Sequence, residues 1–212
     1  HVMTDLTFYT HPYSRGRIVR WMLEELGVPY DVKLLDYGST MKAPEYLAIN
    51  PMGKVPAIKH GDTVVTEVAA ICTYLADAFP EKHLAPPVDS KLRGTYYRWL
   101  FFFAGPLEMA TSARAFGWKL DAENAQSVGC GQYQDAINTL VSAVEKGPYI
   151  CGEQFTAADV IAGSYIGWGI MQKTMDPLPA LTAYLARVEQ RAAAKRANEL
   201  DDALAEQMSA AM

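Results

Sequence analysis

The pattern of apolar and polar residues divides the first third of the chain into alternating strands and helices. Residues 5–10 (DLTFYT) alternate and are rich in strand-forming side chains, which predicts a β-strand. From Ser14 onward apolar residues recur at helical spacing, with Ile18 and Leu26 on one face, and Gly27 ends the pattern. We therefore predict a strand followed by a helix.

The pattern continues to Pro80 with further short elements. In chain order these are a strand (30–37), a short helical turn (42–51), two strands joined around Gly61 (54–60 and 62–67) and a helix that begins at Thr66 (66–79). The order strand-helix-strand and then strand-strand-helix predicts a mixed sheet with flanking helices.

Strand signals are missing after the proline-rich segment HLAPPVDS at residues 83–90, whereas helical spacing continues toward the C-terminal end. The predicted fold class is therefore an α/β domain followed by an all-α domain. We expect the α/β domain at residues 3–83, a linker at 84–91 and the helical domain at 92–212, with Met3 as the native start.

Composition favours a globular protein that does not bind nucleic acid. Hydrophobic residues make up 50% of the 212 residues and charged residues 20%, which is enough apolar material for a packed core. The net charge of −5 leaves no basic surplus to neutralise phosphates. Apolar runs are shorter than a membrane span, so no membrane partner is expected.

The three cysteines, Cys72, Cys130 and Cys151, form no C-x-x-C pair, and their odd number favours a reducing compartment. We therefore expect a cytoplasmic protein. The sequence contains no H-E-x-x-H, P-loop or G-x-G-x-x-G motif, so neither a metal nor a nucleotide is expected as a cofactor.

Pro56 lies within the strand-like run 54–60, although proline cannot donate a hydrogen bond to a sheet ladder. One interpretation is an edge strand with an ordinary trans bond. The other is a cis Val55-Pro56 bond, which would leave the backbone of Val55 free to pair with an extended peptide ligand. The residues alone leave both interpretations open.

Ser14 also has two interpretations. As a helix cap it would bond only the nearby backbone. It also follows the first strand, at the edge where α/β sheets hold ligands and where helix N–H groups favour an anion. A serine hydroxyl is too weak an acid to act as a base, but it can donate a hydrogen bond to a thiolate or oxyanion.

Two charged residues lie near these features. Glu67, in the first turn of the helix predicted from Thr66, is either an acid placed favourably near a helix N-terminus or the partner of a ligand amine. Lys54 is either a solvated charge on an edge strand or a ligand contact.

The segment FTAADVIAG carries a helix-capping pattern. Thr156 and Asp159 fit the T-x-x-D box, and Phe155 and Val160 are placed for a hydrophobic staple. We interpret these residues as structural and expect Asp159 to be buried.

Aromatic residues gather where the second domain begins. Such a stripe is either core or part of an apolar pocket. Its members, with one methionine, are Tyr96, Tyr97, Trp99, Phe101, Phe102, Phe103, Met109, Phe116 and Trp118.

Four segments, in their order and spacing, resemble the cytosolic glutathione transferase family, in particular its bacterial serine-type (theta- or beta-like) members. They are YTHPYSRGRIVRWMLEELGVPYD, NPMGKVPAI, TEVAAICTYLADAFP and FTAADVIAG. The resemblance implies a thioredoxin-like first domain, a helical second domain that carries the electrophile pocket, and a cis proline at Pro56. It also implies glutathione as cosubstrate, a homodimer and a role in detoxification.

The resemblance assigns roles to individual residues. Ser14 matches the hydroxyl that bonds the glutathione sulfur; Tyr9 is the alternative, since other classes use a tyrosine of the first strand. Lys54 matches a side chain that reaches the ligand's carboxylate, and Val55 matches a residue whose backbone pairs with the cysteinyl part of the tripeptide.

Glu67 matches the acid that meets the γ-glutamyl amine. The next position departs from the family's pattern, because Val68 stands where members commonly carry Ser or Thr. Only the backbone N–H of Val68 remains to bind the γ-glutamyl carboxylate, so the affinity for glutathione is expected to be modest.

The leading hypothesis is a glutathione S-transferase in which Ser14 and a helix N-terminus stabilise the glutathione thiolate for attack on a hydrophobic electrophile. Alternatives with the same fold are a glutathione-dependent isomerase, peroxidase, dehalogenase or etherase, and a non-catalytic binding protein. A thiol-disulfide oxidoreductase is disfavoured, because Ser14 stands where such proteins keep their reactive cysteine. The cysteines of this chain are expected to be inert.

Overall fold

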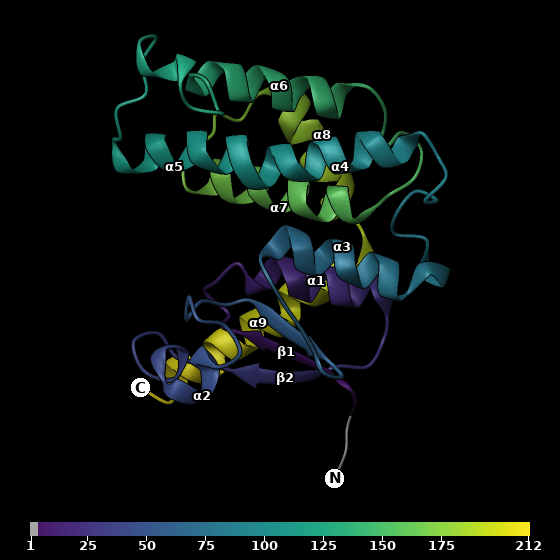
Figure 1. The fold of residues 1–212 in the computed structure, drawn as a ribbon, viewed down its shortest axis with the longest axis vertical. Coiled ribbons are helices and arrows are strands. Elements are labelled where there is room, and N and C mark those ends of the chain that lie inside the picture. Colours follow the sequence, from purple (N-terminus) through teal and green to yellow (C-terminus); the bar gives the residue numbers. More distant parts are fainter. Residues whose placement is uncertain (1–3) are drawn as a thin grey trace. The chain divides into compact units, whose positions relative to one another are not determined.

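The structure, a computed structural model, describes residues 4–212, and the expected start at Met3 lies outside this part of the chain. The contacts within the chain divide it into two units, coloured along the sequence in Figure 1. The first unit combines the residues up to Lys82 with Arg191–Met212, and the second is His83–Gln190.

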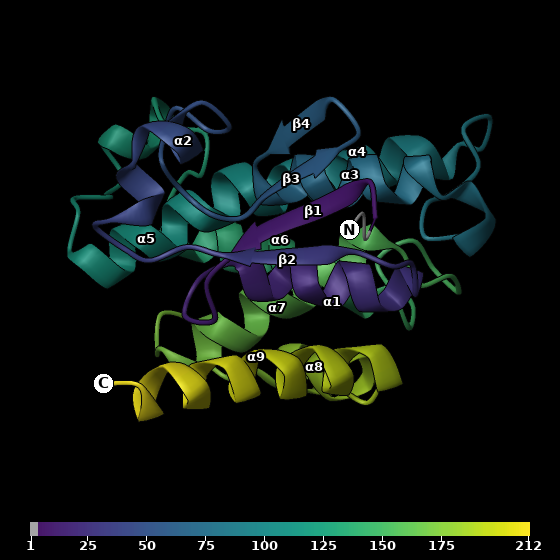
Figure 2. The same cartoon turned by 90° about the horizontal axis from the view of Figure 1, so that it is seen from below.

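The first unit contains a mixed sheet with the strand order β2-β1-β3-β4 (Figure 2). β1 is parallel to β2, whereas β3 is antiparallel to both β1 and β4. This arrangement confirms the predicted fold class. The elements of the unit are β1 (Leu6–Thr10), α1 (Gly16–Leu26), β2 (Asp31–Leu34), η1 (Thr40–Lys42), α2 (Pro44–Leu47), β3 (Ala57–His60), β4 (Thr63–Thr66), α3 (Val68–Ala78), η2 (Pro80–Lys82) and α9 (Ala192–Ala210).

Helices cover both faces of this sheet. α1 and α3 pack on one face, where the guanidinium carbon of Arg20 lies 5.6 Å from the ring centroid of Phe8. α2 lies on the other face, where the rings of Tyr9 and Tyr46 are 5.5 Å apart. Because successive strand residues point to opposite faces, Thr10 shares the α1 face with Phe8.

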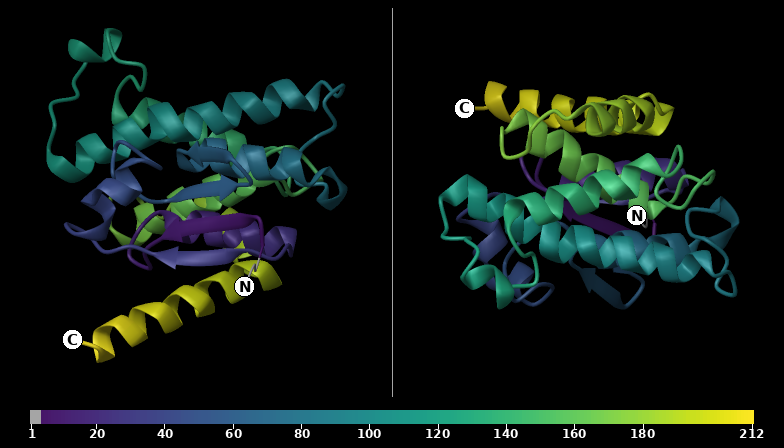
Figure 3. Two further views of the ribbon diagram at one scale, coloured as in Figure 1. Left: turned by 60° about the horizontal axis from the view of Figure 1, so that its bottom comes forward. Right: turned by 90° about the horizontal axis from the view of Figure 1, so that it is seen from above.

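The last helix, α9, packs along α1 within the first unit (Figure 3). The buried guanidinium of Arg20 on α1 donates twice to Oδ1 of Asp201, at 3.2 and 3.3 Å, and Arg17 donates to Asp202 at 2.9 Å. The division by contacts therefore differs from the boundary expected from the sequence, which placed all of residues 92–212 in the helical domain. The ion pair between Arg20 and Asp201 joins residues that are 181 positions apart. The local spacing of apolar residues cannot reveal such a pairing, so the sequence pattern did not place α9 with the first unit.

The regular elements of the second unit, whose residues are all described, are helices. Residues 84–91, the expected linker, contain neither helix nor strand. α7 is buried on all sides over residues 157–163, as expected for a helix at the centre of a core. The helices are α4 (Leu92–Phe102), η3 (Phe103–Leu107), α5 (Glu108–Phe116), η4 (Asn124–Gln126), α6 (Tyr133–Glu145), α7 (Ala157–Met171) and α8 (Pro179–Glu189).

The predicted capping pattern is confirmed at the start of α7. The hydroxyl of Thr156 accepts the N–H of Ala158 at 3.2 Å, and Oδ2 of Asp159 accepts the N–H of Thr156 at 2.9 Å. Asp159 is fully buried, and its Oδ1 also accepts the N–H of Ile150 at 2.9 Å and the hydroxyl of Tyr184 at 2.7 Å. One carboxylate thus joins the start of α7 to the preceding loop and to α8.

Candidate functional site

The strand register brings most of the predicted site residues to one edge of the sheet. Tyr9, near the end of β1, lies opposite Ala57 at the start of β3, and Ala57 lies opposite Thr66 at the end of β4. This is the kind of edge at which α/β sheets hold ligands. The predicted residues adjoin these strand ends, with Ser14 after β1, Lys54 and Val55 before β3, and Glu67 and Val68 after β4.

Ser14 is buried just before α1, and its hydroxyl makes local bonds. The hydroxyl donates to the carbonyl oxygen of His11 at 2.6 Å and accepts the N–H of Gly16 at 2.9 Å. The same His11 carbonyl also accepts the N–H of Ser14 at 3.1 Å. The carbonyl therefore keeps a donor if the Ser14 hydroxyl turns toward another acceptor, which makes such a rotation inexpensive.

Gly16, the first residue of α1, lies against the end of β1. A Cβ atom at this position would lie 1.8 Å from Oγ1 of Thr10 and 2.9 Å from Oγ of Ser14. The Thr10 side chain is fully buried, and within residues 4–212 its hydroxyl has no hydrogen-bond partner. No local sequence pattern indicates a role for Gly16 or Thr10, because the contact between a helix start and a strand end forms only in the folded chain.

Replacing Gly16 with alanine should destabilise the protein and displace Ser14, because the added methyl group meets Thr10. Overpacking of this kind lowers the free energy of unfolding by about 1–3 kcal/mol. Gly94→Ala in α4 is the matched control, since no atom lies within 4 Å of its Cβ position. Helix propensity should make that variant more stable by about 0.5–1 kcal/mol. Denaturant unfolding measures both changes, and equal effects would contradict a close contact at Gly16.

The Val55-Pro56 peptide bond is cis, which confirms the second of the two interpretations of Pro56. Among residues 4–212, neither the N–H nor the C=O of Val55 pairs with another backbone group. The carbonyl of Lys54 accepts the Tyr46 hydroxyl at 2.6 Å and the Asn50 amide at 2.9 Å. These bonds hold the chain just before Val55 and leave the polar groups of Val55 available.

Glu67 lies before α3 and not in its first turn, so the predicted start of this helix is wrong by two residues. Thr66 instead ends β4, where it pairs with Ala57. Glu67 joins the two elements with φ 74° and ψ 121°, a conformation that costs a non-glycine residue about 1–3 kcal/mol. Its side chain is exposed, and that of Val68, the first residue of α3, is partly buried. Backbone strain of this kind gathers at functional sites.

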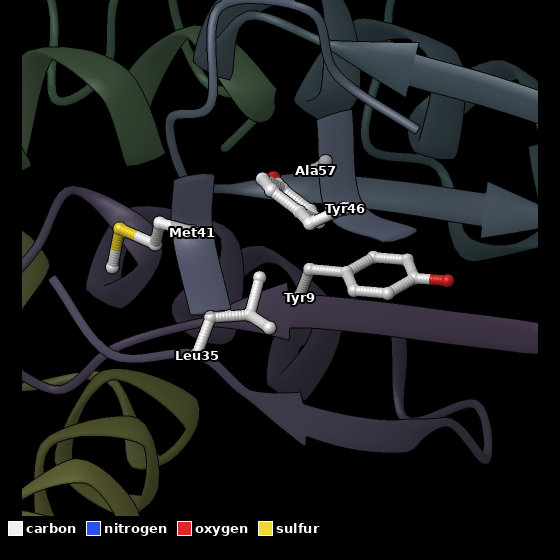
Figure 4. Close-up of a cluster of buried hydrophobic side chains, with 5 residues drawn as sticks. All are labelled: Tyr9, Leu35, Met41, Tyr46 and Ala57. Atoms are coloured by element: carbon white, nitrogen blue, oxygen red, sulfur yellow. The ribbon is translucent and has the colours of Figure 1, made fainter. Parts of the chain in front are cut away.

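Tyr9, the alternative to Ser14, belongs to a buried cluster beside α2 (Figure 4). Thr10, the next residue, faces α1 and approaches Gly16. The Tyr9 ring therefore lies on the face of the sheet opposite to Thr10. The other members of the cluster are Leu35, Met41, Tyr46 and Ala57, with Ile49 and Val55 packed against it.

Tyr37, which no sequence pattern indicated, contacts the loop that holds Ser14. The ring of Tyr37, which follows β2, packs edge-on against His11 with centroids 4.7 Å apart. Its hydroxyl donates to the carbonyl of Tyr13, 24 positions away, at 3.3 Å. Burial raises the pKa of Tyr37, and the influence of the Ser14 hydroxyl partly offsets this rise. No local pattern could have indicated Tyr37, because it reaches the Ser14 loop only through the folding of the segment after β2.

His11 supports the loop that holds Ser14. Its Nδ1 accepts the N–H of Tyr13 at 3.1 Å, which requires that nitrogen to be unprotonated. Burial lowers the pKa of His11, against an opposing effect of Asp36. The imidazole is therefore neutral at pH 7, and the loop keeps this bond.

The three cysteines are buried and form no disulfide. Burial raises the pKa of the Cys151 thiol to about 11 and that of Cys72 still higher, so these two thiols are protonated near neutral pH, in line with the expectation that they are inert. In the described part of the chain, no group of His, Cys, Asp or Glu side chains could hold a metal ion. None of the helices described is both long and apolar enough to cross a membrane.

Comparisons with known proteins support the resemblance described in the sequence analysis. A family model for the glutathione S-transferase N-terminal domain matches residues 12–78. The glutathione S-transferase GstA of Escherichia coli O157:H7 is 31% identical over 149 residues, which cover 69% of this chain and 73% of the relative.

The likeness to solved structures covers both units. A glutathione transferase from Methylococcus capsulatus is 26% identical with a TM-score of 0.77, covering 93% of this chain and 98% of the other. BphK, a bacterial glutathione transferase solved as a ternary complex, is 28% identical with a TM-score of 0.77, covering 92% of this chain and 99% of the other.

Proposed function

Because this chain belongs to the glutathione S-transferase family, we propose that it binds glutathione at the sheet edge of the first unit and that the Ser14 hydroxyl stabilises the thiolate of the bound tripeptide. The observation that carries the proposal is the hydrogen bonding of the Ser14 hydroxyl. Its proton is held by a carbonyl that already has a second donor, so it can turn to a sulfur.

The rest of the tripeptide would use the neighbouring residues. The unpaired N–H and C=O of Val55 would bond the cysteinyl backbone as an added strand does. Glu67 would accept the γ-glutamyl amine, and the N–H of Val68, at the start of α3, would meet the γ-glutamyl carboxylate. The exposed Lys54 would reach the carboxylate at the other end of the ligand.

The chemistry would begin with loss of the thiol proton to solvent. The Ser14 hydroxyl and the N-terminal end of α1 favour the anion, so a larger share of the sulfur is nucleophilic near neutral pH. The thiolate lone pair then forms a sulfur–carbon bond with the electrophile, and the leaving group departs with its bonding electrons. Tyr9 is the weaker candidate for the donor, because its ring lies in the cluster on the α2 face.

The electrophile would be small and hydrophobic, bound by the helical second unit, His83–Gln190. Phe116 and Trp118, which are exposed and stacked with centroids 5.7 Å apart, support an apolar binding surface in this domain. We also propose a serine-type enzyme of the cytoplasm that acts in detoxification as a homodimer; the exposed Phe101 on α4 supports an apolar surface for a second copy.

Two measurements on the unaltered protein test the proposal. Calorimetry should show glutathione binding, with an affinity that Val68 makes modest, and an aryl halide should be consumed only when glutathione is present. A panel of other substrates separates conjugation from glutathione-dependent isomerase, peroxidase, dehalogenase or etherase activity. Binding without turnover of any of these substrates would favour a non-catalytic binding protein, and absence of binding would refute the proposed site.

A further inference from the structure

Tyr37 reaches the Ser14 loop from a distant part of the chain. Two contacts place it there: its ring packs edge-on against His11, and its hydroxyl donates to the carbonyl of Tyr13, the residue before Ser14. The hydroxyl therefore lies on the backbone next to Ser14, although Tyr37 as a whole is 58% exposed.

The hydrogen-bonding capacity of Ser14 leaves room for Tyr37. A serine hydroxyl has one proton and two lone pairs. The proton now bonds the carbonyl of His11, and the N–H of Gly16 occupies one lone pair. When the proton turns to a thiolate, the second lone pair can accept a further donor. The Tyr37 hydroxyl, which bonds the carbonyl of the adjoining residue Tyr13, is the donor that we consider.

The proton of Tyr37 is easily redirected. Its present bond to the Tyr13 carbonyl is 3.3 Å long, whereas O–H···O bonds are most often about 2.7–2.8 Å. Exchanging this long hydrogen bond for one to the Ser14 oxygen would therefore cost little free energy.

We propose that Tyr37 is a positioning residue whose hydroxyl donates to Oγ of Ser14 and thereby directs the Ser14 proton to the glutathione sulfur. The chain of donors runs from Tyr37 to Ser14 to the thiolate, and each bond polarises the next, which strengthens the last one. The inference rests on the proposed function of Ser14. Tyr37 itself does not touch the sulfur.

Tyr37→Phe tests the proposal, because it removes the hydroxyl and keeps the ring against His11. The ultraviolet absorbance of bound thiolate, titrated with pH, should show a higher thiol pKa, and turnover below that pKa should fall about 3- to 5-fold, as for the loss of one neutral hydrogen bond. The affinity for S-methylglutathione, which cannot ionise, should stay unchanged. Tyr13→Phe is the matched control, since this ring also packs against His11, and it should leave the titration as it is.

The double variant Ser14→Ala/Tyr37→Phe decides whether Tyr37 acts through Ser14. If it does, Tyr37→Phe has no further effect once Ser14 is alanine. An undiminished effect in that background would show Tyr37 acting without Ser14 and overturn the proposal. If Ser14→Ala raises the thiol pKa but Tyr37→Phe does not, this inference fails and the proposed function stands. If Ser14→Ala has no effect on the thiol, both fail.

Discussion

Replacing Ser14 with alanine should reduce glutathione-dependent turnover at pH 6.5 about 10- to 100-fold, the range expected when a hydrogen bond to a charged group is lost. The bonds that Ser14 makes in the structure are short and local, so the fold should survive. Alanine removes the donor to the thiolate and the acceptor of the Gly16 N–H, whereas the carbonyl of His11 keeps the backbone N–H of residue 14 as a donor. Binding of S-methylglutathione should change little.

The pH profile separates this effect from a loss of structure. Ser14 lowers the pKa of the bound thiol in our proposal, so its contribution is fully present at pH values below that pKa. Alanine moves the pKa toward the value of a free thiol, about 8.5, and the rates of the two proteins should converge as the pH rises above it. Initial rates and thiolate absorbance between pH 5.5 and 9 measure both trends.

Ser142→Ala is the matched control for this variant. Ser142 on α6 also donates to a carbonyl oxygen three residues earlier at 2.6 Å, as Ser14 does, but it is exposed in the helical unit. Its replacement should leave the rate and the pH profile unchanged. A Ser14 variant that behaves like the Ser142 variant would remove Ser14 from the mechanism and return attention to Tyr9.

Replacing Asp159 with alanine should lower the free energy of unfolding by about 3–5 kcal/mol, as expected when buried partners lose a shared charge. The carboxylate accepts the N–H groups of Ile150 and Thr156 and the hydroxyl of Tyr184, all in the interior. Alanine leaves these three donors without their acceptor and removes the bonds that connect the start of α7 to the preceding loop and to α8. Denaturant unfolding followed by tryptophan fluorescence measures the loss.

Asp135→Ala is the matched comparison, because it removes the same kind of helix cap from an exposed position. Asp135 occupies the same place in the capping box of α6, where its Oδ2 accepts the N–H of Gln132 at 2.8 Å, but it is exposed. Loss of a cap on an exposed helix costs about 0.5–2 kcal/mol. Similar losses at both sites would mean that burial of the Asp159 network adds nothing to stability.

Features that depend on neighbouring residues could be predicted from the sequence. The capping box at Thr156 and Asp159 needs only residues three positions apart, and both its bonds and its burial were foreseen. Gly27 ends α1 in the left-handed conformation, with φ 66°, and its N–H bonds the carbonyl of Leu23, as its place after a helical pattern indicated. The mixed sheet followed from the order of strands and helices.

Features that depend on pairing between distant segments could not be predicted from local patterns. Thr66 and Glu67 fit a helix start by composition, yet the ladder between β4 and β3 draws Thr66 into a strand and leaves Glu67 at positive φ. The charged residues of α9 look like an ordinary solvated face until Arg20 is seen to meet Asp201.

The candidate site divides in the same way. The sequence by itself determined the residue types at the strand ends, namely Ser14, Val55 and Glu67, because each stands next to a local break in the pattern. Only the tertiary structure decided that these ends share one edge, that Gly16 must be small beside Thr10, and that Tyr37 lies against the Ser14 loop. The reason is that local propensity depends on a few neighbouring residues, whereas strand register and close packing depend on segments that meet only after the chain has folded.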